Sequence, residues 1–457
     1  MKPHPPVFSA LRQEFYDWRL WTSRGVVLAF AALAGLTVVA FTWLTEHALA
    51  GFFEMEQAFW WAPLVWAPAS TAAIVWLTRR HVPGAAGSGI PQVMAALSAE
   101  VPPASRSLYV SLRLTVAKML LTAWGLLAGL SLGREGPSVQ IAAGVMHHAR
   151  RWLPARSHVP ERGLLVAGGA AGIAAAFNTP LGGVMFAIEE LTRRPEERSS
   201  GLLLSAIVLA GLIAVSAYGN ATYFGVIRIE HFSLALLLPG LLVAVCSGVA
   251  GGLFARLVAI STAGHSPDWF SRMRQRAPIR FAAGCGLAVA VLGVVSQGDT
   301  YGSGYGHTRA LLEGSGESSP LYVLLKFVAT WITAWSGVPA GVFAPSLAIG
   351  AALGNDLAQL TAYANAPTLI ALGMAGFLAA VTQAPLTAFI IVMEMVDGHA
   401  LVLSLMASTM VASGVSRLIS APLYPSLADQ QLLRIQKLAA QANPAAGNPS
   451  EPAPGRA

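Results

Sequence analysis

Charged residues are scarce in this chain, and their scarcity limits what the protein can be. Only 11% of the 457 residues are Asp, Glu, Lys or Arg, whereas 55% are hydrophobic. A soluble domain carries about 25% charged residues, so this chain cannot cover the surfaces of the roughly three soluble domains that its length would otherwise suggest. The shortage argues against a soluble enzyme, a nucleic-acid-binding protein and a disordered scaffold. Together with a mean hydropathy of +0.58, it predicts a polytopic membrane protein.

The chain also has few cysteines and no recognisable metal-binding motif. Cys246 and Cys285 both lie in apolar stretches, where we expect small core residues rather than a disulfide. His147 and His148 lie near a basic loop without the spacing of metal ligands, and no His-Glu-x-x-His pair occurs. No convincing Ser/His arrangement suits intramembrane proteolysis. We therefore expect neither enzyme activity nor a metal or other cofactor.

The positive charges that are present separate the apolar stretches. The net charge is +7, and Lys2, Arg12, Arg19 and Arg24 precede the first long apolar run, at 25–43. By the positive-inside rule, we predict that segment 1–24 is cytoplasmic, and it shows no cleavable signal. Further basic clusters lie between apolar stretches at 150–162, 193–198 and 272–280. We expect a multi-pass protein of the cell (inner) membrane with both termini in the cytoplasm.

The apolar stretches vary in length and are rich in glycine and proline. They lie at 25–43, 62–77, 108–132, 163–188, 202–217, 232–260, 281–295, 321–335, 340–353, 369–393 and 401–418, and the chain contains 45 Gly and 28 Pro. A perpendicular span needs about 20 apolar residues, so some stretches are too short and others are long enough for two pieces. Broken helices at membrane depth are tolerated where they are buried or line a wet cavity. This pattern favours a transporter or channel.

An internal repeat strengthens that interpretation. At an offset of 208 residues, 8 of 26 positions are identical, including Lys118 with Lys326 and Pro137 with Pro345. Further on, a Pro-Leu pair in each half precedes glutamates 8 to 10 residues later, Glu189 and Glu190 in the first half and Glu394 in the second. Transporters with a midplane site at a repeat interface have this organisation. We predict membrane repeats at 25–220 and 221–436 and a disordered tail at 437–457; the pattern alone leaves parallel and inverted repeats open.

Two Gly/Pro motifs in the first half predict helix starts that face a ligand. In Gly-Ser-Gly-Ile-Pro at 87–91, Ser88 is either an ordinary N-cap or a hydroxyl donor to an anion. In Gly-Arg-Glu-Gly-Pro at 133–137, Glu135 is a carboxylate within an apolar region, which is a functional hypothesis by default. The alternative is that Glu135 pairs with Arg134 to stabilise a loop.

Three further features complete the set of candidates. Gly-Val-Phe-Ala-Pro at 341–345 is the repeat partner of 133–137, with Phe343 in place of the glutamate, so it offers backbone donors without a charge. Glu189 and Glu190 end the apolar run at 163–188 beside Arg193 and Arg194, where interfacial carboxylates are an equal alternative to function. Tyr424 is read locally as a tyrosine of the membrane interface.

In this order, the motifs at 87–91, 133–137 and 341–345 and the late Tyr424 resemble the CLC chloride channel/transporter family, over about residues 24–424. The resemblance implies an all-α membrane fold of about 18 mostly membrane helices, many tilted or broken, in two inverted-topology repeats. It also implies a homodimer with one pore per subunit. The likeness does not include the CBS pair of many relatives, so nucleotide regulation is not expected.

The resemblance also implies roles for individual residues. Ser88 and Tyr424 would hold the central anion by their hydroxyls, the amides of Val342 and Phe343 would complete the site, and Gly136 is included in the same anion-binding set. Glu135 would be the external gate and proton carrier. Glu190 would be the internal proton acceptor of the family's exchangers, which channel members generally lack. The resulting hypothesis is H⁺/Cl⁻ exchange across the bilayer, with a passive chloride channel as the alternative and an intramembrane enzyme as a remote third.

Overall fold

The computed structural model describes residues 18–155, 157, 159–192, 201–219, 222–225, 234–264, 266–316 and 319–442, with side chains up to residue 433. Every regular element within these residues is a helix. The expected N-terminal segment up to residue 17, the basic residues Arg193 and Arg194, and the tail from residue 443 lie outside the described residues. Helix α19 reaches Ala442, beyond residue 437, where we expected the tail to begin.

The first half of the chain contributes eight α-helices and four short helical segments. In chain order they are α2 (Trp18–Ala58), α3 (Ala62–His81), η1 (Pro83–Ala85), α4 (Ile90–Leu97), η2 (Pro103–Leu108), α5 (Leu112–Leu127), α6 (Glu135–His148), η3 (Ala149–Trp152), α7 (Glu161–Phe177), α8 (Pro180–Phe186), η4 (Ala187–Thr192) and α9 (Gly201–Tyr218). Of the short segments, η4 is a π-helix that continues α8 without a break.

The second half contributes ten α-helices and two short segments. They are η5 (Leu234–Leu236), α10 (Leu237–Ala263), α11 (Trp269–Arg276), α12 (Pro278–Val295), α13 (Tyr305–Leu312), α14 (Tyr322–Ser336), α15 (Phe343–Leu360), α16 (Ala366–Thr382), α17 (Pro385–Met395), η6 (His399–Leu401), α18 (Val402–Arg417) and α19 (Leu423–Ala442). The expectation of about 18 helices is confirmed by the 18 α-helices of the described residues.

Six helical segments of the described chain are long and apolar enough to cross a membrane. They are α2, the segment Pro103–Leu127, α9, α10, α12 and the segment His399–Arg417. Other helices are shorter, and several end or begin within the apolar stretches seen in the sequence. Short helices of this kind fit a membrane only when their ends are covered by protein or line a polar cavity.

Two of the long apolar runs, 163–188 and 369–393, are each divided into two helices in the same way. Helices α7 and α16 both contain 17 residues, and each is followed by a residue in the left-handed conformation, Asn178 (φ 58°) and Gln383 (φ 57°). A proline two residues later then opens the next helix, α8 or α17. A left-handed C-cap followed by proline is a strong stop signal, and here it repeats in both halves.

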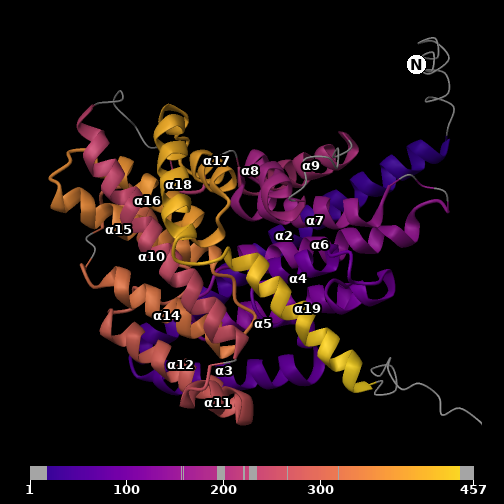
Figure 1. The fold of residues 1–457 in the computed structure, drawn as a ribbon, viewed down its shortest axis with the longest axis horizontal. Helices are drawn as coiled ribbons and strands as arrows, with labels where there is room; N and C mark the ends of the chain where they lie inside the picture. The colour runs from indigo at the N-terminus through magenta and orange to yellow at the C-terminus, as the bar shows by residue number, and fades with distance from the viewer. Residues whose placement is uncertain are drawn as a thin grey trace, which may run out of the picture.

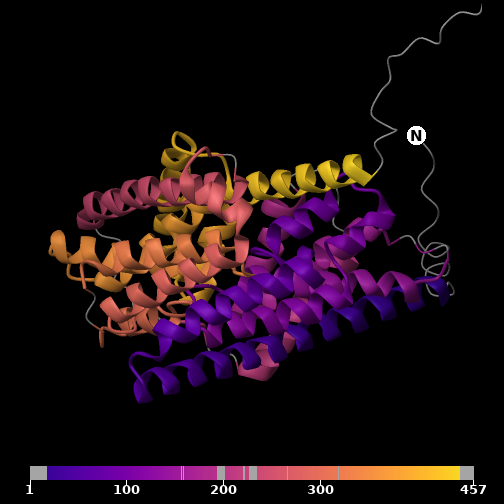
Figure 2. The same cartoon turned by 90° about the horizontal axis from the view of Figure 1, so that it is seen from below.

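The two halves lie side by side, and helices of each half pack against helices of the other. In Figure 1 most of the first half lies on the right and most of the second half on the left, while the yellow helix α19 extends to the lower right and α3 lies at the bottom beside α12. Helix α3 packs against α12 of the second half, and α19 packs against α4 of the first. Figure 2 shows α2 along one edge of the molecule and α19 along the opposite edge. The elements of the two halves therefore meet in the middle of the molecule.

A local two-fold relation is visible where the repeats touch. Gly133 and Gly341, which correspond at the offset of 208, form an antiparallel bridge. The Gly133 amide donates to the Gly341 carbonyl over 2.7 Å, and the Gly341 amide returns a hydrogen bond of 3.1 Å. Each glycine lacks room for a Cβ, which at Gly341 would approach the Gly133 carbonyl. Reciprocal pairing of equivalent residues is what an inverted repeat produces.

Candidate functional site

Three helix N-termini converge where the halves meet. Helices α4, α6 and α15 each begin at a Gly/Pro motif, as the sequence predicted. Both α4 and α15 contact α6, and α19 contacts α4. The first N–H groups of a helix have no partner within the helix and carry a partial positive charge. The arrangement therefore directs backbone donors toward one region of the molecule.

Hydrogen bonds between the loops before these helices fix their relative positions. The Gly87 amide donates to the Val338 carbonyl (3.1 Å), and the Ala340 amide donates to the Gly87 carbonyl (3.2 Å). This ladder joins the Ser88 loop to the loop before α15, beside the bridge between Gly133 and Gly341. The contacts involve backbone atoms, so the three helix starts form one connected unit.

The carboxylate of Glu135 reaches the start of α15. Glu135 is the first residue of α6 and is fully buried. Its Oε2 accepts a hydrogen bond of 3.3 Å from the Ala344 amide, whereas its Oε1 has no hydrogen-bond partner among the described residues. An ionised carboxylate in this position is held by the donors of a helix N-terminus, as any other anion would be.

Two buried hydroxyls lie next to this carboxylate. Tyr424, near the start of α19, is completely buried and lies beside Ser88, within electrostatic range of Glu135 and Glu190. Apart from the contact of the two hydroxyls with each other, neither Ser88 nor Tyr424 has a hydrogen-bond partner for its hydroxyl within the described part of the chain. Buried polar groups are nearly always satisfied, so two such hydroxyls at one place suggest a ligand site.

Gly136 allows α6 to approach Ser88 closely. A Cβ at this position would collide with the Ser88 hydroxyl, and a Cβ at Gly89 would meet the Gly136 carbonyl. The two glycines interlock, which brings the N-terminus of α6 against the Ser88 loop. Glycine is needed here because of this contact between backbones.

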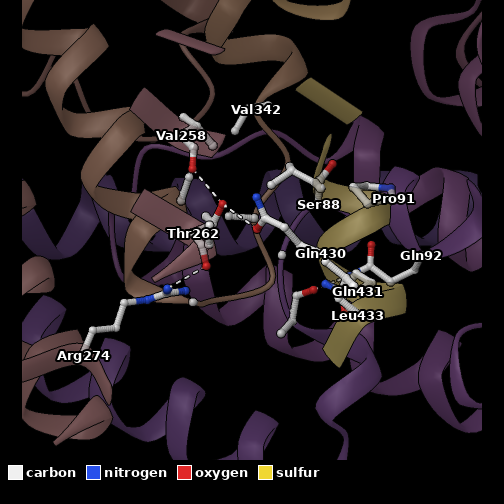
Figure 3. Close-up of a pocket in the computed structure, with 17 residues that line it drawn as sticks. Ser88, Pro91, Gln92, Val258, Thr262, Arg274, Val342, Gln430, Gln431 and Leu433 are labelled. Atoms are coloured by element: carbon white, nitrogen blue, oxygen red, sulfur yellow. Dashed lines mark hydrogen bonds between the residues drawn. The ribbon is translucent and has the colours of Figure 1, made fainter. Parts of the chain in front are cut away.

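A cavity leads to this region from the side of α19. It has a volume of about 300 Å³ and is lined by residues of the loops, α10, α11 and α19, including Ser88, Val342, Thr262, Arg274 and Gln430. In Figure 3, Arg274 points toward Thr262 and Gln430 crosses the cavity beside Ser88. Arg274 donates to the Thr262 carbonyl (2.9 Å), and the Thr262 hydroxyl donates to the Gln430 side chain (3.2 Å). Two of the predicted anion-binding residues, Ser88 and Val342, thus line one passage, together with several polar side chains.

Phe343 connects the region to Glu190 on the other side. Both residues are buried, and they line one small gap together with Phe186, Thr382 and Thr387. The gap has no room for a water molecule in this conformation. Phe343 also packs against Phe177, with ring centroids 5.3 Å apart. Glu190 is therefore separated from the convergence of helix starts by an apolar side chain.

The neighbouring glutamates Glu189 and Glu190 have different surroundings. The two carboxylate oxygens of Glu189 accept from the amides of Leu386 (3.2 Å) and Thr387 (2.6 Å) at the start of α17. Glu190 points into the core instead. Both lie in the π-helix η4, a distortion often found at functional sites. The different surroundings disfavour the interpretation of both residues as equivalent interfacial charges.

Comparison with known proteins places the chain in a family. Residues 69–417 match the family model described as "Voltage gated chloride channel". The chain belongs to the voltage-gated chloride channel family. This membership confirms the family resemblance and agrees with a multi-pass membrane protein. Two relatives named "H(+)/Cl(-) exchange transporter ClcA" are the Salmonella arizonae protein (28% identical over 443 residues, 92% of this chain and 90% of the relative) and that of Cronobacter sakazakii (29% over 425 residues, 88% of each).

Solved structures of this family share the fold. A slow cyanobacterial Cl⁻/H⁺ antiporter matches with a TM-score of 0.79 and 25% identity, over 91% of this chain and 99% of that chain. A CLC-type fluoride/proton antiporter matches with a TM-score of 0.71 and 22% identity, over 93% and 99%. The predicted CLC fold with two inverted repeats is thereby confirmed.

Two repeat-related lysines each hold a loop by its backbone carbonyls, a role that the sequence did not reveal. The ammonium group of Lys118 donates to the carbonyls of Ala85 (2.9 Å) and Gly87. The ammonium group of Lys326 donates to the carbonyls of Thr300 (2.9 Å) and Gly302 (2.8 Å). Both lysines are fully buried. Lysine within an apolar run is rare, and this was the available signal.

Gln92 and Arg134 also act locally in ways that the motifs did not show. Gln92 accepts from the Gly89 amide (2.9 Å) and donates to the Ala86 carbonyl, so it closes the Ser88 loop. Arg134 does not serve only Glu135: its guanidinium donates to Glu46 of α2 (2.8 Å) and to the Tyr223 hydroxyl (3.3 Å). Arg134 thus forms its direct ion pair with Glu46, which disfavours the alternative of a simple pair between Arg134 and Glu135.

Proposed function

We propose that this chain is a proton-coupled chloride antiporter. The observation that carries the proposal is the Glu135 carboxylate bound at the N-terminus of α15, next to the buried hydroxyls of Ser88 and Tyr424. Amides and hydroxyls without a cation suit an anion that must bind and leave again. The same donors suit chloride and an ionised carboxylate, so the two compete.

Competition between Glu135 and chloride couples the two ions. When Glu135 is ionised, it occupies the donors at Ala344. When it is protonated, it loses its charge, its attraction to the helix N-terminus weakens, and it swings out while it carries the proton. Chloride then takes the donors, with Ser88, Tyr424, Gly136 and the amides of Val342 and Phe343 around it. One site thus alternates between an anion and a carboxylate.

Glu190 is the second proton acceptor in this proposal. It lies behind Phe343, away from the passage that leads to Ser88. Protons that enter by way of Glu190 avoid the anion path, so anion and proton approach the site from different directions. Proton transfer between Glu190 and Glu135 requires the gap beside Phe343 to open enough to admit water.

The relatives support exchange and suggest the substrates, the location and the subunit arrangement that we expect. The similar proteins named above are H(+)/Cl(-) exchange transporters, and by that analogy we assign chloride and protons as substrates, the inner membrane as location and cytoplasmic termini. A homodimer with one pore per subunit belongs to the same proposal. No cofactor takes part. A passive chloride channel is the alternative within the family.

Reconstitution in liposomes distinguishes exchange from a channel. With an imposed chloride gradient and external pH as the readout, an exchanger drives protons uphill, against their own gradient. Chloride flux without uphill proton movement would identify a channel, and absence of chloride flux would contradict both. The ratio of chloride to proton movement then gives the stoichiometry.

A further inference from the structure

A basic pocket lies on the outside of the first half, away from the anion site. It has a volume of about 580 Å³ and lies between the start of α5 and the end of α6. Its wall contains the arginines Arg113, Arg150 and Arg151, the histidines His147 and His148, and the serines Ser107 and Ser111. Several cationic and hydroxyl donors therefore face one concave surface that transport does not use.

The positively charged side chains around the pocket outnumber the nearby carboxylates that pair with them. Glu161 accepts from Arg106 (2.9 Å), from Arg150 (3.0 Å) and from His147 (2.8 Å). One carboxylate therefore pairs with two arginines and a histidine. Arg113 donates to the His81 carbonyl (3.1 Å), which neutralises no charge. The start of α5, capped by the Ser111 side chain, adds the partial positive charge of a helix N-terminus.

The pocket lies on the same side of the molecule as the N-terminus of α2. The Ser23 hydroxyl donates to the Ser157 hydroxyl (3.2 Å), which connects the first turns of α2 to the loop after η3. Phe30 of α2 lies 6.2 Å from the ring of His148 in the pocket wall. This is the side on which the positive-inside rule places the cytoplasm.

An apolar stripe continues from the pocket along α5. The exposed side chains Leu112, Val116 and Leu120 recur every four residues along α5, and Leu112 itself lines the pocket. Residues four apart lie on one face of a helix, and the eight steps from Leu112 to Leu120 extend about 12 Å at 1.5 Å per residue. That length covers most of one leaflet, which is about half of a hydrocarbon core of roughly 30 Å. Trp152, which is 64% exposed, lies near the pocket as an interfacial anchor would.

We infer that this pocket binds an anionic glycerophospholipid, with the phosphate among the arginines and an acyl chain along the stripe on α5. Arginine forks match phosphate oxygens geometrically, and basic pockets between membrane helices at the cytoplasmic surface bind such headgroups. The stripe distinguishes a lipid from a soluble anion, because a free phosphate has no part that the leucines would contact.

Lipid titration of the purified full-length protein tests the inference. Native mass spectrometry in detergent would follow binding of phosphatidylglycerol, with phosphatidylcholine as the neutral comparison. We expect phosphatidylglycerol to bind more tightly, and R113Q/R151Q to weaken it by about 30-fold, from roughly 1 kcal/mol for each basic residue. The matched control R272Q/R276Q removes two exposed arginines from α11 and leaves binding unchanged.

Two outcomes would overturn the inference. In one, both double variants weaken phosphatidylglycerol binding equally, which would mean that net charge alone attracts the lipid. In the other, inorganic phosphate displaces phosphatidylglycerol at equal concentration, which would mean a site for free anions. Chloride flux in neutral-lipid liposomes shows that the variants fold, because none of these arginines contacts the anion site. Retained flux with lost lipid binding also separates this inference from the proposed function.

Discussion

Individual buried polar groups carry the proposed transport, because the membrane interior leaves few ways to satisfy them. Glu135 has one oxygen on the Ala344 amide and one without a described partner. The nearby hydroxyls of Ser88 and Tyr424 have no described partner apart from each other. A group that is costly to bury and incompletely bonded is retained for function more readily than for stability.

Replacing Glu135 by glutamine tests the gate. Glutamine resembles the protonated carboxyl group in shape and cannot carry a proton, so E135Q should lose uphill proton transport while chloride still moves. The measurement is external pH against chloride efflux in the same liposomes, with the exposed α2 residue E54Q as a control that remains coupled. Proton pumping that persists in E135Q would remove Glu135 from the mechanism.

Gly136 offers a test of the anion site that changes no charge. A methyl group there would collide with the Ser88 hydroxyl, so G136A should displace Ser88 and weaken chloride binding by about tenfold or more, corresponding to roughly 1–3 kcal/mol of overpacking. Calorimetric titration of chloride measures the affinity. G414A, a helical glycine with open space around it, is the control; equal affinities in both variants would contradict the placement of Gly136.

Helix ends explain why two adjacent glutamates differ. Glu189 caps the start of α17, and Glu394 at the end of α17 caps the start of α8 through the amides of Leu181 (3.2 Å) and Gly182 (2.7 Å). The two caps are related by the repeat and hold α8 against α17 in both directions. Glu190, one residue beyond the first cap, is turned into the core by the π-helix η4.

These surroundings predict different losses for the two substitutions. E190Q should stop proton transport while chloride still moves, because the anion site is unaltered. E189Q should keep coupling but lose about 1 kcal/mol of stability, as other N-cap replacements do, and E394Q should match it. Flux assays and thermal unfolding in detergent measure both effects. If E189Q and E190Q behaved alike in proton transport, the channel alternative would replace the exchanger.

The sequence predicted those elements whose signals are local. Glycine and proline mark the starts of α4, α6 and α15, and Pro180 and Pro385 divide the long apolar runs. A π-turn has no comparable signal, so the local pattern did not distinguish Glu189 from Glu190, and only the family resemblance singled out Glu190. The contact of Arg134 with Glu46 joins residues 88 positions apart, and only the packing of α2 against α6 creates it.

At the scale of the whole molecule, one lateral face combines apolar side chains with half-buried carboxylates. Helices α8, α9, α17 and α18 expose Leu181, Leu212, Leu386 and Met410, and Glu189 and Glu394 lie among them with part of their surface open. Leucines tolerate lipid, whereas a carboxylate in contact with hydrocarbon is unfavourable. A second copy of the chain on this face would cover the carboxylates, which gives the expected homodimer a physical reason.

Bulky substitutions on this face should therefore separate the subunits. L212W/M410W adds two large rings to α9 and α18, and we expect monomers in single-molecule photobleaching of the reconstituted protein. V116W/L120W places the same rings on the exposed side of α5, which does not contact these helices, and should remain dimeric. The monomer should still exchange chloride for protons, because α4, α6, α15 and α19 of one chain supply the complete site. A dimer that resists L212W/M410W would exclude this face, and an inactive monomer that remains folded would mean that the two subunits share a pore.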